Sequence, residues 1–130
     1  MTDTDPVNAL RAIAFHLERA REETYRVKAY RRAADTVAAL DPDEVRTRVA
    51  RGTLTDLKGV GAKTARVVAE AVNGEEPAYL AELRAAQAAP VAGGSTLRDA
   101  LRGDCHTHST WSDGGSDILE MARTARDLGH

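Results

Sequence analysis

The chain of 130 residues has few aromatic side chains, one cysteine and only three lysines. Aromatic residues make up 4% of the sequence while alanine is common, which favours small, closely packed helices over a sheet of β-branched residues. The single Cys105 excludes an internal disulfide and fits a reducing compartment. No apolar run approaches the roughly 20 residues that span a bilayer, and the acidic N-terminus lacks the features of a signal peptide. We therefore expect a cytoplasmic protein with no membrane partner.

The net charge of −2 gives no overall basic field that would indicate a nucleic-acid partner. Residues 1–86 carry 14 Lys/Arg and 14 Asp/Glu, and residues 87–130 carry 4 and 6. Any binding of DNA must therefore come from positive groups that converge locally on one face.

Residues 5–86 show the signals of a compact helical domain, and the fold class predicted for the whole chain is mostly α. Asp5-Pro6 and Asp41-Pro42 each combine a capping side chain with proline at the first helical position. Apolar residues recur at three- and four-residue steps, which predicts buried stripes. The expected helices run from Pro6 to about Ala20, from about Tyr25 to Leu40, from Pro42 to Gly52, over one turn from a Thr53 cap to Leu57, from Ala62 to Asn73 (burying Ala65, Val68, Ala69 and Val72), and onward from Pro77.

Residues 53–73 predict a helix-hairpin-helix around the turn Leu57-Lys58-Gly59-Val60-Gly61. Two glycines allow a tight turn and a close approach of a ligand. The next helix would begin with free amides at Gly61, Ala62 and Lys63, which suit a phosphate oxygen. Such contacts ignore bases, so we expect sequence-independent binding to the DNA backbone through Gly59 to Lys63. The alternative is an ordinary tight turn between two helices.

A second positive cluster surrounds Tyr30 and consists of Arg26, Lys28, Arg31 and Arg32. Lys28, Arg31 and Arg32 stand three and four residues apart, so they are expected to share one helix face and to contact DNA. A solvated helix surface is the competing interpretation. Tyr30 lies on the apolar stripe and is expected in the core.

The segments 25–34 and 52–63 together resemble the 8-kDa N-terminal domain of X-family DNA polymerases, a likeness that covers residues 5–86. The resemblance implies DNA phosphate binding at the hairpin, with Na⁺ or K⁺ held by the backbone carbonyls of Thr55, Leu57 and Val60. Some members of this family are also deoxyribose-phosphate lyases, in which a lysine forms a Schiff base with the substrate. Val67 stands at the position of that lysine in this chain. We therefore expect no lyase activity.

The character of the sequence changes after residue 86, where an Ala-, Pro- and Gly-rich linker is predicted over residues 87–102, with a short helix at residues 97–101. Residues 103–108 are predicted as a strand, and Ser116 as the cap of an amphipathic helix that Gly129 ends. A strand followed by a helix is the beginning of an α/β unit. Since no second strand follows, residues 103–130 are expected to be a truncated α/β domain.

His106 and His108 alternate on the predicted strand, so both imidazoles would point to one side and share a divalent ion, Mn²⁺, Zn²⁺ or Fe²⁺. Asp113, on the following glycine-rich turn, could supply an oxygen ligand. The stretch Asp104–Gly114 resembles the first motif of the PHP (polymerase and histidinol phosphatase) phosphoesterases, which implies a β/α barrel with two or three metals. Cys105 is expected to be a small buried hydrophobe, with a Cys-His metal site as the alternative.

Together these observations predict a helix-hairpin-helix that targets a PHP-type phosphoesterase or nuclease to gapped, nicked or ended DNA, in a setting such as DNA repair. No polymerase domain fits between the two parts, and the later metal ligands of the PHP family are missing, so no catalysis is expected from these 130 residues. Two alternatives remain: a module that only binds DNA, and a small-molecule phosphatase acting on a compound like histidinol phosphate.

Overall fold

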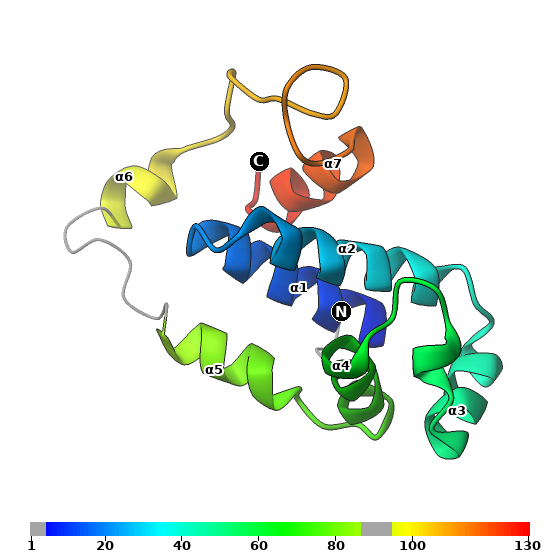
Figure 1. Ribbon diagram of the computed structural model, residues 1–130. Coiled ribbons are helices and arrows are strands. Elements are labelled where there is room, and N and C mark those ends of the chain that lie inside the picture. Colours follow the sequence, from blue (N-terminus) through cyan, green and yellow to red (C-terminus); the bar gives the residue numbers. More distant parts are fainter. Residues whose placement is uncertain (1–4, 87–94) are drawn as a thin grey trace. The chain divides into compact units, whose positions relative to one another are not determined.

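A computed structural model describes residues 5–86 and 95–130, and the chain divides into two units, Met1–Ala89 and Pro90–His130, which are treated separately below. The first unit holds α1 (Pro6–Arg19), α2 (Thr24–Ala38), α3 (Pro42–Arg51), the 3-10 turn η1 (Leu54–Asp56), α4 (Ala62–Val72) and α5 (Ala78–Ala86). The second unit holds α6 (Ser95–Ala100) and α7 (Ile118–Asp127). The mostly helical fold expected from the sequence is therefore confirmed (Figure 1).

Most helix boundaries follow the capping signals in the sequence. The carboxylate of Asp5 accepts a hydrogen bond from the Asn8 amide at 2.9 Å, and Asp41 caps α3 in the same way through the Asp43 amide. Two predicted caps are wrong. Thr53 precedes η1 without a side-chain capping bond, and α7 is capped by Asp117, whose side chain accepts from the Glu120 amide at 2.7 Å, instead of by Ser116.

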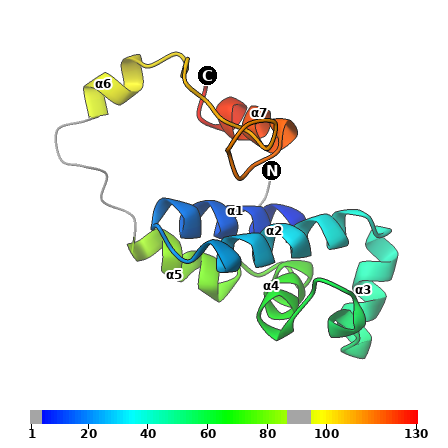
Figure 2. The same cartoon turned by 45° about the horizontal axis from the view of Figure 1, so that its top comes forward.

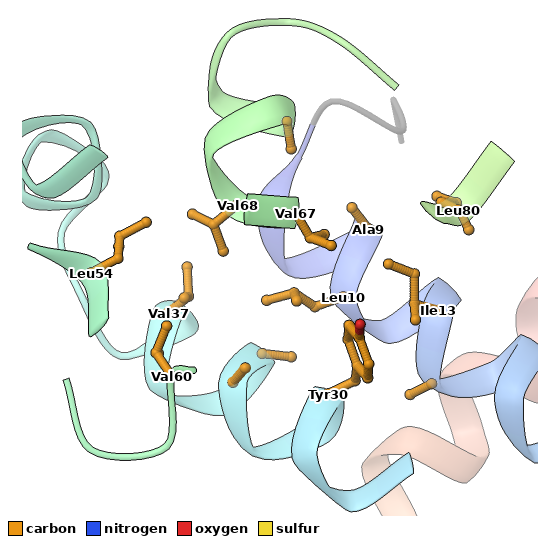
Figure 3. Close-up of a cluster of buried hydrophobic side chains, with 14 of the residues drawn as sticks. Ala9, Leu10, Ile13, Tyr30, Val37, Leu54, Val60, Val67, Val68 and Leu80 are labelled. Atoms are coloured by element: carbon orange, nitrogen blue, oxygen red, sulfur yellow. The ribbon is translucent and has the colours of Figure 1, made fainter. Parts of the chain in front are cut away.

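In the first unit α1 lies at the centre, in contact with α2, α4 and α5, while α3 packs against α4 and η1 (Figures 1 and 2). The core between these elements is one cluster of buried apolar side chains (Figure 3). Leu10, Ile13 and Leu17 of α1 are completely buried in it. Burying each of these side chains stabilises the fold by roughly 1.5–3 kcal/mol.

The buried face of α4 differs from the predicted one. Ala65, Val68, Ala69 and Val72 were expected inside; Val68 is fully buried, and Ala65 and Val72 pack partly buried against the core. The other buried residues of the helix are Thr64, Val67 and Ala71. The helix contacts α1, α3, α5 and η1 together. Which face of α4 is buried depends on its packing against all four of these elements. The spacing of apolar residues within α4 alone does not predict it.

The predicted strand over residues 103–108 is wrong, since none of the described residues lies in a β-strand. A strand needs a partner for its backbone hydrogen bonds, and the described part of this unit offers none. The helix expected at residues 97–101 is present as α6, and residues 87–94 of the predicted linker lie outside the described residues. None of the described helices is long and apolar enough to cross a membrane.

Tyr30 makes the stability of the first unit sensitive to alkaline pH. Burial raises the pKa of Tyr30 to about 12, Tyr79 adds to the shift and Arg26 opposes it. Because the pKa is higher in the folded than in the unfolded state, its stabilising contribution is complete below about pH 10 and is lost as the pH rises towards 12.

We expect wild-type protein to lose about 2 kcal/mol more unfolding free energy than Tyr30→Phe between pH 8 and pH 12. Urea denaturation at both pH values measures the difference. Equal alkaline losses in the two proteins would contradict the assignment to Tyr30.

Candidate functional site

The hairpin between η1 and α4 is a tight turn closed by a hydrogen bond from the Val60 amide to the Leu57 carbonyl at 3.1 Å. Gly59, the third residue of this turn, has φ +96°, a conformation that side chains with a Cβ rarely adopt. An added Cβ at Gly59 would lie 2.9 Å from Cγ of Arg32 and 3.1 Å from the hydroxyl of Thr36. The turn therefore lies directly against α2.

Two contacts fix the turn in place. The side chain of Val60 is 6% exposed and belongs to the same buried cluster as Val37 and Leu54 (Figure 3). The hydroxyl of Thr36 donates a hydrogen bond to the Lys58 carbonyl at 3.2 Å. Val60 can therefore meet a ligand only through its backbone, and the sequence contained no signal for the role of Thr36.

The start of α4 is accessible, but one of its predicted free amides is occupied. The Gly61 amide donates to the hydroxyl of Thr64 at 3.0 Å, so it is not available to an anion. Ala62 and Lys63, the first residues of the helix, are exposed. A Cβ built on Gly61 meets nothing within 4 Å, so the space in front of the helix start is open. The proposed anion position is therefore reduced to the amides of Ala62 and Lys63.

Some of the positively charged side chains around the turn form ion pairs and others do not. In the part of the chain that the structure describes, no ion pair involves Lys28, Lys58, Lys63 or Arg32. We call these four residues the hairpin cations. Lys58 and Lys63 flank the turn, the carbon atoms of Arg32 lie beside Gly59, and Lys28 stands one helical turn before Arg32. A local positive surface thus forms on a chain whose net charge is negative.

Arg31, which was expected to share a DNA-binding face with Lys28 and Arg32, differs from them in having an ion-pair partner on α1. Its guanidinium lies 2.7 Å from the carboxylate of Glu18 on α1, and its side chain is 14% exposed. Neighbouring residues point about 100° apart on a helix, so Arg31 faces α1 while Arg32 faces the hairpin.

A hollow of about 660 Å³ opens beside the turn, between α2, α4 and α5. Its lining includes Tyr25, Arg26, Arg66 and Tyr79, which were not among the predicted site residues. Arg66 stands three residues after Lys63, a spacing that could have revealed it, whereas Tyr79 reaches the hollow only through the tertiary fold. Val67, at the position of the lyase lysine in the X-family resemblance, also lines the hollow and is 2% exposed.

Arg26 links two walls of this hollow. One terminal nitrogen donates to the hydroxyl of Tyr79 at 2.8 Å, and another forms an ion pair with Glu22. Tyr79 first, and Glu22 after it, raise the pKa of Arg26 above its ordinary value. The guanidinium therefore remains charged wherever the protein is folded.

The carbonyls of Thr55, Leu57 and Val60, expected to hold Na⁺ or K⁺, belong to η1 and to the turn that follows it. The Leu57 carbonyl already accepts the Val60 amide, but a carbonyl oxygen has a second lone pair for a cation. The donor chemistry is compatible with a monovalent ion, and binding there remains a proposal.

In the second unit His106 and His108 meet although they are not in a strand. Their Nε2 atoms are 2.8 Å apart, and the ring centroids are separated by 4.9 Å. The loop behind them is closed tightly, because a Cβ on Gly114 would lie 2.5 Å from the His108 carbonyl oxygen. Cys105 is exposed, so the expectation that it is buried is wrong.

Asp113 takes a different place from the one expected of a metal ligand. Its carboxylate lies 2.6 Å from Nδ1 of His108, on the opposite side of the ring from the nitrogen that faces His106. A carboxylate in this position can orient the imidazole of His108. Among the described residues, no three His, Cys, Asp or Glu side chains gather in a way that could hold a metal ion, so the donors do not complete a divalent site.

Comparison with known proteins bears on the first unit. A family model described as a helix-hairpin-helix domain matches residues 1–77, which is more than half of the chain. No curated protein and no solved structure matches at a significant level. The match includes the turn at residues 57–61, the hairpin cations and the start of α4, and it ends before α5. The chain therefore belongs to the helix-hairpin-helix domain family.

Proposed function

We propose that the first unit binds DNA without regard to base sequence, by holding backbone phosphates at the turn between η1 and α4. The observation that carries this proposal is the position of the hairpin cations: Lys58 and Lys63 flank the turn, Arg32 lies beside it, and Lys28 stands one helical turn from Arg32. None of them has an ion pair among the described residues, and the helix start between them is exposed. The helix-hairpin-helix family assignment supports it.

The chemistry of the turn explains why sequence would not be read. The amides of Ala62 and Lys63 and the four cations are suited to phosphate oxygens, which are the same at every base pair. The positive end of α4 adds a partial charge at the same point. Gapped, nicked or ended DNA offers phosphates that are not constrained within a continuous duplex, and these are the forms that we propose as partners.

Lys63 should contribute one phosphate contact. We expect Lys63→Ala to weaken binding to a short duplex and to reduce the slope of log Kd against log salt by about 1. Fluorescence anisotropy at several salt concentrations gives both values.

Arg46→Ala is the matched control, since it removes the same charge from α3, where Arg46 pairs with Asp43 and lines a different hollow. Its salt slope should equal that of the wild type. If the two variants lose the same slope, the charge acts through the whole domain and the proposed contact at the hairpin is wrong.

We further propose that residues 103–130 supply two ligands, His106 and His108, to the divalent metal site of a PHP-type phosphoesterase, which the helix-hairpin-helix would bring to DNA in a setting such as repair. The approach of the two Nε2 atoms and the orienting contact from Asp113 support this proposal. Because the described donors do not complete a metal site, we derive no catalytic step from them and expect no phosphoester hydrolysis by this chain.

For this second proposal we expect His106→Ala to weaken Zn²⁺ binding at least about tenfold, since one of two imidazole ligands is lost. Affinity for DNA should not change. Calorimetric titration with Zn²⁺ and anisotropy with DNA measure the two properties. His130→Ala serves as the control within the same unit. Equal losses of Zn²⁺ affinity in both variants would refute the paired site.

A further inference from the structure

The hollow beside the hairpin has a lining that differs from the surface around the turn. Gly61 and Lys63 line it on the side of the proposed phosphate contact. Tyr25 of α2 and Tyr79 of α5 supply accessible aromatic surface, whereas Tyr30, which also lines the hollow, is only 6% exposed. The hollow therefore combines the proposed phosphate contact with an aromatic surface.

The lining of the hollow also carries charged groups of both signs. Glu70 of α4 and Glu82 of α5 both line it. Glu70 is fixed there, because its carboxylate pairs with Arg66 at 2.8 Å and accepts the Ala78 amide at 3.0 Å. Arg66 also lines the hollow and neutralises Glu70, and no ion pair among the described residues involves Glu82. The carboxylate of Glu82 can therefore accept a hydrogen bond from a ligand in the hollow.

The aromatic side chains are arranged as contact surfaces. The rings of Tyr30 and Tyr79 lie 6.0 Å apart with an angle of 34° between their planes. The hydroxyl of Tyr79 is held by Arg26, which fixes the ring of Tyr79. Tyr25 is 70% exposed, and nothing in its own unit buries it. An exposed tyrosine beside a positive surface is the arrangement on which unstacked bases pack in single-strand binding sites.

We propose that this hollow receives one unstacked nucleobase from the strand whose phosphate is held at Ala62 and Lys63. The inference rests on the proposed DNA binding and adds to it the part of the nucleotide that is recognised. A base is uncharged and aromatic on both faces, so it suits the tyrosines, and an amino group on it can donate to the carboxylate of Glu82. A paired base inside a duplex could not enter. The domain should therefore prefer DNA that has an unpaired base.

The test compares two gapped duplexes that differ by one base. In one, the nucleotide opposite a one-nucleotide gap is adenine, and in the other a tetrahydrofuran residue replaces it, so that both carry the same number of phosphates. We expect the wild-type chain to bind the adenine duplex about 5- to 150-fold more tightly, the range that stacking of one base supports. Equal dissociation constants would overturn the inference.

Variants of Tyr25 test whether the preference for the adenine duplex arises in this hollow. Tyr25→Ala should reduce the ratio of the two dissociation constants towards 1 and leave the affinity for the tetrahydrofuran duplex unchanged, while Tyr25→Phe should keep the wild-type ratio. A wild-type ratio in Tyr25→Ala would overturn the assignment to this hollow.

The same measurements separate this inference from the proposal on which it rests. If wild-type protein binds neither duplex, the proposed DNA binding itself fails. If both duplexes bind equally and binding weakens with salt, only the base-binding hollow fails.

Discussion

Replacing Gly61 with valine is expected to weaken binding to a DNA duplex by about 10- to 150-fold while helical content and stability stay close to wild type. Gly61 has φ −101° and ψ 179°, an extended conformation that valine adopts without strain. The fold also has room where the side chain begins, because a Cβ at this position meets no atom within 4 Å beyond its chain neighbours. The substitution is therefore expected to weaken DNA binding without destabilising the fold.

The size of the effect follows from the contacts that would be blocked. The valine side chain would occupy the open space in front of the Ala62 and Lys63 amides, where a phosphate oxygen must approach. Hydrogen bonds to a charged group contribute about 1.5–3 kcal/mol, which corresponds to the stated range in affinity. Anisotropy with a duplex and circular dichroism of the free protein measure the two halves of this prediction.

Gly103 offers a matched control, since it also meets nothing within 4 Å and belongs to the second unit. Gly103→Val should leave affinity for DNA at the wild-type value. An unchanged affinity in Gly61→Val would refute the phosphate site at the start of α4.

Replacing Gly59 with alanine is expected to lower the free energy of unfolding by about 2–3 kcal/mol. Its φ of +96° is costly for any residue with a Cβ, by about 1–2 kcal/mol. The new methyl group would also displace Arg32 and crowd the hydroxyl of Thr36, which donates to the Lys58 carbonyl. The turn would therefore lose part of its attachment to α2.

Two further alanine substitutions separate these causes. Gly52→Ala introduces a Cβ at φ +67° into open space, so it carries the backbone cost alone, about 1 kcal/mol. Gly61→Ala carries neither cost and should change stability by less than about 0.5 kcal/mol. Chemical denaturation of the three proteins gives the order Gly59→Ala, Gly52→Ala, Gly61→Ala from most to least destabilised. A Gly59→Ala protein as stable as Gly52→Ala would show that the contacts with Arg32 and Thr36 contribute nothing.

Local signals predicted the framework of the first unit with good accuracy. The caps at Asp5 and Asp41 and the end of α3 at Gly52 lie where the sequence placed them. These features depend on hydrogen bonds between residues close in the chain, so a short sequence contains all the necessary information. The strand at residues 103–108 could not be judged in this way, because strand pairing depends on a partner elsewhere.

The sequence by itself determined that a glycine turn joins two helical segments and that positive residues stand near it. Tertiary structure decided which of these groups can meet a ligand. Arg31 is neutralised by Glu18 of α1 while the adjacent Arg32 lies beside Gly59, and the Gly61 amide is taken by Thr64. The hollow likewise exists only where α2, α4 and α5 come together. Helix periodicity determines which residues share a face of one helix. The packing of several helices against one another determines which charges are paired and which surfaces remain open.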